Sequence, residues 1–190
     1  MLQFNRGFQR DRDTPPMQAS PMKYTVFAFL LMASPLSVLA EWGVMNLIDA
    51  DTNEKTTIAY TKNAAGYTLE IYQDREGVIH SRFTINGGFN ILSQNTCPTF
   101  QVDKHKPINL SINDELCVPD KKSADFILGY VENNKVVSRP LHYVMVGKSI
   151  VYRFNLENGG YGETEFSLQG SMRALIGTLG LEIEVVPTDR

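Results

Sequence analysis

Residues 150–168 read IVYRFNLENGGYGETEFSL, and this stretch decides the fold class. Large side chains recur at every second position on both sides of a turn, at Ile150, Tyr152, Phe154 and Leu156 and then at Thr164, Phe166 and Leu168. That period is typical of strands with one buried face. Between the two runs lies Asn158-Gly159-Gly160, whose residues tolerate the positive φ of a tight turn. The stretch therefore predicts an antiparallel hairpin.

The same alternation continues through residues 41–190. It recurs at Tyr67, Leu69 and Ile71, at Ile108, Leu110 and Ile112, at Phe126, Leu128 and Tyr130, at Leu141, Tyr143 and Met145, and at Leu181, Ile183 and Val185. Further strands are expected over residues 43–49, 57–61, 78–84 and 89–93. About ten short strands separated by turn residues predict an all-β fold, either an antiparallel β-sandwich or a barrel-like domain.

One segment breaks this period and predicts one short C-terminal helix. Ser171 suits an N-cap, Gly180 suits the helix end, and Met172, Leu175, Ile176 and Leu179 share one face at helical spacing. Gly177 costs such a helix about 1 kcal/mol relative to Ala. We therefore expect packing of its apolar face to hold the helix in place.

The segment 22–40 has the form of a secretory signal peptide. Lys23 precedes an apolar run that ends in Val38-Leu39-Ala40, so cleavage is expected between Ala40 and Glu41. An uncleaved membrane anchor is the alternative, but Pro35 interrupts a run that is shorter than the roughly 20 residues of a spanning helix. A periplasmic or secreted protein with no integral membrane span after cleavage is predicted.

Residues 1–21 are polar and contain Pro15-Pro16. They are interpreted either as a disordered leader or as the result of a mis-assigned start, with translation beginning at Met22; an extended n-region is the other interpretation. In each case the fold is expected in a single β-rich domain, residues 41–190.

The two cysteines, Cys97 and Cys117, both follow the signal peptide. An even number of cysteines in an oxidising compartment predicts one disulfide. Closing a loop of about 20 residues contributes on the order of 3 kcal/mol. There is no Cys-x-x-Cys motif, so the pair is interpreted as a structural crosslink rather than a redox centre.

The charge balance disfavours nucleic-acid and anionic-membrane partners. The 190 residues carry a formal net charge of −3, and removing residues 1–40 leaves −5 because four basic and two acidic side chains are lost. Binding to polyanions needs clustered positive charge. Lys104, His105, Lys106 and the pair Lys121-Lys122 are interpreted as solvated loop residues.

No familiar catalytic, cofactor-binding or metal-binding motif occurs after residue 40. Asp49, Asp51 and Asn53 resemble the start of a calcium loop, but Glu54 and Tyr60 replace the required Gly and Glu. The three histidines, His80, His105 and His142, are 25 and 37 residues apart, and this spacing neither requires nor excludes a zinc site. No catalytic residues, no cofactor and no metal are predicted, and the chain is not expected to be an enzyme.

Tyrosines are the best candidates for a partner surface, because their rings are apolar and their hydroxyls polar. The possible partner surface comprises Tyr72, Tyr130, Tyr143 and Tyr152. Strands favour tyrosine in any case, so part of this set is interpreted as ordinary strand residues. Trp42 is expected to pin the first strand.

Two stretches resemble the invasion-associated locus B family of exported proteobacterial proteins. The first contains Cys117-Val118-Pro119-Asp120 and Ala124, and the second runs through Leu168-Gln169-Gly170 to Ala174-Leu175. Trp42 also stands near the start of the mature part, as a Trp does in that family. The likeness spans about residues 115–180. It implies a periplasmic or outer-membrane-associated β-sandwich linked to host association, with no catalytic residues to carry over.

The cysteines depart from the family pattern. The second cysteine that the family carries after Pro-Asp is absent here, where Lys122 and Ser123 stand, and the family's cysteine pair soon after the Trp is also missing. Cys117 therefore needs another partner, and Cys97 is the one available.

These observations favour a non-enzymatic exported β-sandwich of the bacterial envelope that binds a protein or envelope partner. One alternative is an envelope enzyme or inhibitor-type module with an unfamiliar site, which a histidine within hydrogen-bond reach of a carboxylate or serine would favour. Another is a carrier of a small apolar ligand, which needs a sizeable cavity. Exposed tyrosines gathered on one sheet would favour the first hypothesis.

Overall fold

The computed structural model describes residues 41–48, 53–86, 88–113 and 115–187, all within one compact unit of the chain, Ser37–Arg190. The predicted leader and signal peptide, with Ala40 of the cleavage site, lie outside the described residues. So do Asp49 and Asp51 of the Asp-rich turn.

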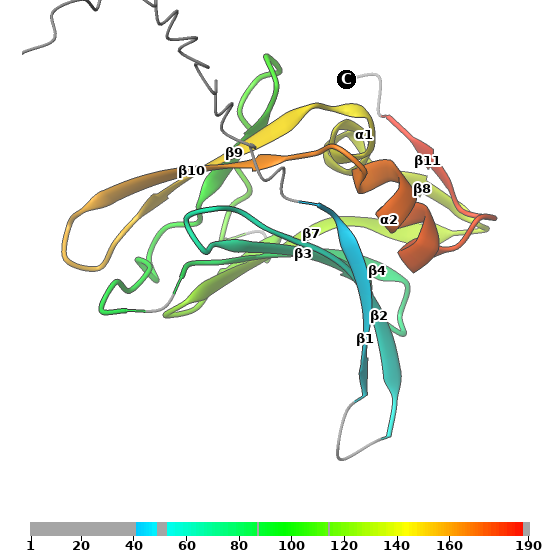
Figure 1. The fold of residues 1–190 in the computed structure, drawn as a ribbon, viewed down its shortest axis with the longest axis horizontal. Coiled ribbons are helices and arrows are strands. Elements are labelled where there is room, and N and C mark those ends of the chain that lie inside the picture. The colour runs from blue at the N-terminus through cyan, green and yellow to red at the C-terminus, as the bar shows by residue number, and fades with distance from the viewer. Residues whose placement is uncertain (1–40, 49–52, 87, 114, 188–190) are drawn as a thin grey trace, which may run out of the picture. The chain divides into compact units, whose positions relative to one another are not determined.

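Eight strands form a large sheet in the order β1-β2-β3-β4-β7-β8-β11, with β6 paired to β7 (Figure 1). They are β1 (Gly43–Ile48), β2 (Lys55–Lys62), β3 (Thr68–Gln73), β4 (Val78–Thr84), β6 (Cys117–Pro119), β7 (Ser123–Glu132), β8 (Lys135–Val137) and β11 (Glu184–Val186). Neighbours are antiparallel except β11, which runs parallel to β8 with Glu184 opposite Lys135. That parallel pair departs from the antiparallel expectation.

Three strands form a smaller sheet in the order β10-β9-β5. They are β5 (Thr99–Val102), β9 (Ser149–Asn155) and β10 (Tyr161–Ser167). The register of β9 and β10 places Ile150 opposite Phe166 and Phe154 opposite Gly162. The hairpin predicted from residues 150–168 is therefore confirmed.

Two helices lie beside the small sheet, α1 (Arg139–Val146) and α2 (Ser171–Leu179) (Figure 1). α2 packs on β1, β2 and β3 of the large sheet, while α1 contacts β7, β11 and α2. The sandwich thus has the large sheet as one layer, and the small sheet with the helices as the other. The predicted all-β antiparallel sandwich with a short C-terminal helix is confirmed.

The helix α1 corrects the strand expected around Leu141, Tyr143 and Met145. Ser138 caps this helix, because its Oγ accepts a hydrogen bond from the N–H of Leu141 at 3.1 Å. Pro140 in the first turn fits a helix start. Leu141 and Val144, three residues apart, are the buried pair, so the spacing is helical. The alternation of Leu141, Tyr143 and Met145 covers only five residues, and so short a pattern is compatible with either a strand or a helix.

The C-terminal helix starts differently from the prediction. Gly170, at φ 88°, is its N-cap, and Ser171 is the first helical residue and fully buried. The Ser171 Oγ donates to the carbonyl of Val144 at 2.7 Å and so ties α2 to α1. Met172 is exposed, and Ala174, Leu175 and Leu179 form the buried face.

Two of the expected strands are loops. The segments 89–93 and 108–112 contribute only isolated bridges, Leu92 with Leu156 and Ile108 with Phe100. The segment 108–112 lies inside the loop that the Cys97–Cys117 disulfide closes, and the segment 89–93 precedes that loop.

Aromatic rings fill the space between the two sheets. Phe83 of β4 lies against Tyr152 and Phe154 of β9 and against Phe166 of β10. Phe100 of β5 makes an edge contact with Phe126 of β7. Trp42 is buried, and its Nε1 donates to the carbonyl of Ser167 at 2.9 Å, so it pins the start of β1 to the other layer.

The predicted disulfide between Cys97 and Cys117 is present, with its Cα atoms 6.3 Å apart. It joins the segment before β5 of the small sheet to β6 of the large sheet, so it crosslinks the two layers. No helix among the described residues is long and apolar enough to cross a membrane.

Candidate functional site

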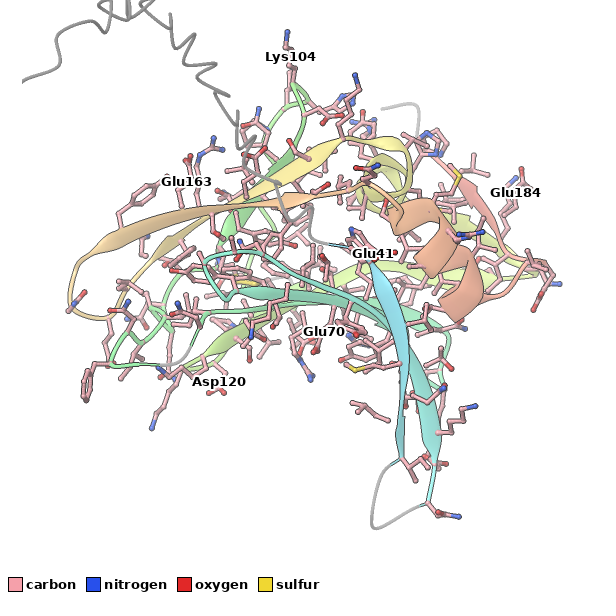
Figure 2. The ribbon with its side chains drawn as sticks, in the orientation of Figure 1. Glu41, Glu70, Lys104, Asp120, Glu163 and Glu184 are labelled. Atoms are coloured by element: carbon pink, nitrogen blue, oxygen red, sulfur yellow. A yellow bond between two sulfur atoms is a disulfide. The ribbon has the colours of Figure 1, made fainter. Side chains whose placement is uncertain are left out.

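The candidate site lies on the outer face of the large sheet, across β3, β4 and β7. Alternation buries Leu69, Ile71, Ile79, Phe83, Ala124 and Phe126 and turns the residues between them outward. We call the outward set the outer polar cluster; it comprises Glu70, Tyr72, His80, Arg82 and Asp125. In Figure 2 Glu70 lies on the side of the large sheet that faces away from the small sheet.

The strand register brings this cluster together. Arg82 of β4 stands opposite Glu70 of β3 and opposite Asp125 of β7, and Tyr72 stands opposite His80. Side chains directly opposite one another share a face of the sheet and are in contact distance. Because β3, β4 and β7 are neighbours in the sheet, side chains as far apart in the sequence as Glu70 and Asp125 come together in one site.

Arg82, Asp125 and Tyr72 form a closed triangle of hydrogen bonds. The Arg82 Nε donates to Asp125 Oδ2 at 2.8 Å, and its Nη2 donates to the Tyr72 hydroxyl at 3.1 Å. The Tyr72 hydroxyl in turn donates to Asp125 Oδ1 at 3.3 Å. The guanidinium also lies 5.5 Å from the centre of the Tyr72 ring. The geometry fixes the tyrosine ring and leaves it half-buried.

This environment shifts the pKa values of the cluster. Burial, followed by the negative charge of Asp125, raises the pKa of Tyr72 to about 12. Burial also raises the pKa of Glu70, against the opposing charge of Arg82. Arg82 is itself half-buried, but its hydrogen bond and charge contact with Asp125 outweigh desolvation and raise the pKa of the guanidinium. Tyr72 is thus a protonated donor at neutral pH.

His80 extends the cluster toward Asp74. Its Nε2 lies 2.9 Å from Asp74 Oδ2, and its ring stacks on Tyr72 with centroids 5.1 Å apart. Desolvation opposes ionisation of Asp74, but hydrogen bonds from His80 and the N–H of Val78 outweigh it and lower the pKa of Asp74. His80 is half-buried between these two partners.

A surface depression of about 560 Å³ adjoins the cluster. Four cluster residues line it, together with Val118, Ile127, Ser123, Glu115 and Asp120. Val118 is 61% exposed, although its side chain is apolar. Neither Glu115 nor Asp120 has an ion-pair partner among the described residues. The depression is therefore lined both by apolar side chains and by acidic side chains that have no ion-pair partner among the described residues.

The arrangement lacks the contacts of a Ser-His-Asp centre. Asp74 and His80 have the distance of a general-base pair. Ser123 is the serine of the depression, but it pairs with Thr84, four residues along β4 from His80. Four residues of strand span about 13 Å, so Ser123 is out of hydrogen-bond reach of His80. Among the described residues no group of three or more metal-binding side chains converges.

The structure separates the four tyrosines of the expected partner surface. Tyr72 lies in the cluster, and Tyr130 lies on the same face because it pairs with Val78, two residues before His80. Tyr130 is 51% exposed, and the third tyrosine on this face is Tyr60, which is also exposed and stands opposite Glu70. Tyr143 instead lies in α1, against the ring of His105.

Tyr152 was placed wrongly on the partner surface. It is 1% exposed and stacks on Phe83 at 4.6 Å between the sheets. Its position between Ile150 and Phe154 in the alternating run already places it on their core face, and burial raises the pKa of its hydroxyl.

The sequence reasoning did not find Arg82, Asp125 or Asp74. The local signal was the alternation in β4 and β7, which turns Arg82 and Asp125 away from the buried Phe83 and Phe126. That they meet each other depends on the pairing of β4 with β7, across about 40 residues of chain, which includes the whole of β5.

Comparisons with known proteins bear on the fold. No family model and no curated protein matches this chain. The crystal structure of invasion associated protein B from Bartonella henselae is similar, at 17% sequence identity and a TM-score of 0.50. The match covers 77% of this chain and 96% of that one. At this identity the likeness concerns the fold alone, and the family resemblance read from the sequence is matched by a shared β-rich architecture.

Proposed function

We propose that this protein is a non-enzymatic, exported protein of the bacterial envelope that binds a protein partner through the outer face of the large sheet. One observation carries the proposal: Tyr60, Tyr72 and Tyr130 share this face with the exposed Val118, beside a depression that Glu115 and Asp120 line. Tyrosine and exposed apolar side chains are enriched where proteins meet.

The charge of the depression indicates the chemistry of the partner. Glu115, Asp120 and Asp125 line it, together with Arg82 and His80. Asp125 is already paired with Arg82, which leaves the other two carboxylates available. The surface fits a partner segment that carries Lys or Arg beside an apolar residue, because opposite charges around an apolar centre favour both encounter and register.

Export is supported by two features. The segment 22–40 reads as a signal peptide, and the disulfide is typical of oxidising compartments. The similar crystal structure belongs to a protein whose name calls it invasion associated. With the resemblance in the sequence, this is the basis on which we propose a role in association with a host.

Site-specific photocrosslinking tests the proposed surface. A photoreactive residue is placed at Val118 of the full chain, in the cells that produce it, and at Tyr161 of β10 as the matched control, since the two side chains are 61% and 63% exposed. We expect an adduct of one defined mass at position 118 alone. It should disappear in the Tyr72→Ala background and under high salt. Equal adducts at both positions, or none, would reject the surface.

An envelope enzyme is the second candidate, favoured by the Asp74–His80 pair beside the depression. It requires a substrate that places its reacting atom within about 3 Å of His80, since no serine lies there. Asp74→Asn separates the two candidates. It would strongly reduce turnover of an enzyme's substrate by removing the partner of His80, while leaving the crosslink at Val118 in place, because Asp74 does not line the depression. The apolar-ligand carrier is the weakest alternative, because aromatic rings occupy the space between the sheets.

A further inference from the structure

A second surface lies at the opposite layer of the sandwich, around helix α1 and the turn after β5. The turn presents Lys104, His105 and Lys106, all exposed. Residues Arg139 and His142 lie on α1, and Lys148 directly follows its C-cap. We call these six residues the basic patch. Figure 2 shows Lys104 at the tip of its turn, on the side of the molecule opposite Glu70 and Asp120.

Specific contacts hold the two halves of the basic patch together. The ring of His105 stacks flat on Tyr143 of α1, with centroids 3.8 Å apart and planes at 9°. The carboxylate of Asp103 accepts hydrogen bonds from the N–H groups of Lys148 and Ser149 at 2.9 to 3.1 Å. Both carboxylate oxygens of Asp103 are therefore occupied by backbone hydrogen bonds. The turn is further closed by the hydrogen bond from His105 N–H to the carbonyl of Val102.

The outward face of α1 completes the surface. Arg139, His142, Tyr143 and Val146 follow one another at helical spacing, while Leu141 and Val144 face the core. Val146 is 52% exposed, although it is apolar. The surface therefore combines basic, aromatic and apolar side chains, the combination found where proteins meet the headgroup region of a membrane.

Positive charge is concentrated in the basic patch. It holds four of the fourteen Lys and Arg residues of the segment 41–190, together with two of its three histidines. The rest of that segment carries ten basic and nineteen acidic side chains. On the side of β10, the acidic Glu165 bounds the patch. It lies two residues before Ser167, which pairs with Ser149, the residue that follows Lys148. Because charge is segregated in this way, a net negative protein still presents one positive side.

We propose that the basic patch docks the protein on a membrane surface of anionic phospholipid headgroups, with the outer polar cluster directed away from the membrane. The occupant follows from charge complementarity and from the mixture of side chains. Clustered Lys and Arg attract anionic lipid, Tyr143 suits the interface, and Val146 exposes an apolar side chain beside them. This inference is independent of the proposed partner at the large sheet. It also runs against the expectation from the sequence that the charge balance disfavours an anionic-membrane partner and that Lys104, His105 and Lys106 are solvated loop residues.

Vesicle sedimentation with the purified full chain tests this docking. The probes are vesicles of phosphatidylglycerol mixed with phosphatidylcholine, and vesicles of pure phosphatidylcholine, which also report any binding by residues 1–40 that does not depend on lipid charge. We expect binding to the anionic vesicles at low salt and release at high salt. Binding that ignores lipid charge or salt would overturn the proposal.

Paired charge reversals locate the binding surface. Lys104→Glu with Lys106→Glu should weaken binding to the anionic vesicles by about 25-fold or more, since each basic residue near the surface contributes about fivefold. Lys55→Glu with Lys62→Glu is the matched control, because both lysines are exposed on β2 and the net charge changes equally. All four side chains are exposed, so both variants should fold, and circular dichroism checks this. Equal losses in the two variants would contradict a specific patch.

A competition arm separates a membrane from a soluble anion. Inorganic phosphate is added to the bound vesicles and compared with sodium chloride at the same ionic strength. Equal displacement is expected for a membrane surface. Stronger displacement by phosphate would mean that the patch is a phosphate pocket, and the failure of wild-type protein to sediment with anionic vesicles would assign it to a soluble partner; both outcomes would reject membrane docking.

Discussion

Phe83 of β4 and Tyr152 of β9 stack face to face between the two sheets, with ring centroids 4.6 Å apart and planes at 6°. Both side chains are fully buried, and Phe166 meets each of them edge-on. This contact is the centre of the core that holds the large sheet against the small one. The outer polar cluster depends on it, since Phe83 and Arg82 are consecutive residues that face opposite sides of β4.

Tyr152→Ala should lower the free energy of unfolding by about 3–5 kcal/mol, because it removes the ring that fills the centre of the core. Tyr152→Phe keeps the ring and loses only the contact of its hydroxyl with Ser81 at 3.4 Å, so it should cost about 1 kcal/mol or less. Urea unfolding followed by fluorescence measures both. Similar losses in the two variants would show that the hydroxyl, rather than the stacked ring, is the stabilising group.

Opening the disulfide by Cys97→Ser together with Cys117→Ser should lower the free energy of unfolding by about 3 kcal/mol, since the bridge closes a loop of about 20 residues. Intact mass with and without reductant measures the bridge itself. We expect a chain that begins at Glu41 and is two hydrogens lighter before reduction. A mass that retains residues 22–40 would contradict the predicted cleavage, and free thiols would contradict the bridge.

Asp125→Asn should bring the pKa of Tyr72 down from about 12 toward the ordinary value of 10.0, because it removes the negative charge that opposes ionisation of the phenol. The partial burial of Tyr72 remains, so the fall should be incomplete. NMR of tyrosine labelled at Cζ follows the titration. Glu163→Gln is the control, because it breaks the ion pair with Arg153 on the small sheet and leaves Tyr72 untouched. An unchanged pKa in Asp125→Asn would mean that burial alone sets it.

The Asp74–His80 pair predicts a stability that depends on acid pH. The folded state lowers the pKa of Asp74 below 3.8, so its contribution is present above that value and is lost as the pH falls below it. Asp74→Asn should therefore destabilise the protein at neutral pH, and the difference from wild type should shrink below about pH 4.

Glu70→Gln provides a control of opposite sign for this titration. The pKa of Glu70 is raised in the folded state, so the ionised carboxylate opposes folding above its ordinary pKa. Its replacement should raise stability at neutral pH, as measured by urea unfolding at a series of pH values. A pH-independent effect of Asp74→Asn would show that its hydrogen bond to Val78, rather than its charge, is what matters.

Gly177→Ala should stabilise the protein by up to about 1 kcal/mol, because alanine favours a helix interior. A Cβ at position 177 would meet only the Cγ2 of Val44, at 3.7 Å, an ordinary contact. Gly162→Ala is the contrasting variant, since a Cβ there would overlap the ring of Phe154. Thermal unfolding should show opposite shifts. A destabilised Gly177→Ala would mean that α2 approaches β1 more closely than this distance.

Much of the fold could be predicted from local pattern. The period of two, the Asn-Gly-Gly turn at 158–160 and the cysteine count led to the sandwich, the β9–β10 hairpin and the disulfide, each of which is present. These features are decided by neighbouring residues or by simple pairing. The strand predicted around Leu141, Tyr143 and Met145 was wrong, because these three residues fit the period of a strand or of a helix. Ser138 and Pro140 were the residues that indicated a helix start.

The candidate site and the basic patch were decided by tertiary structure. Alternation determines which residues share a face of a strand, but not which strands become neighbours. Tyr72, Arg82 and Asp125 meet only because β7 pairs with β4, and Lys104 joins Lys148 only because the turn after β5 packs on α1. Long-range pairing of this kind depends on how all the apolar faces are buried at once, and that is a property of the whole chain rather than of any segment.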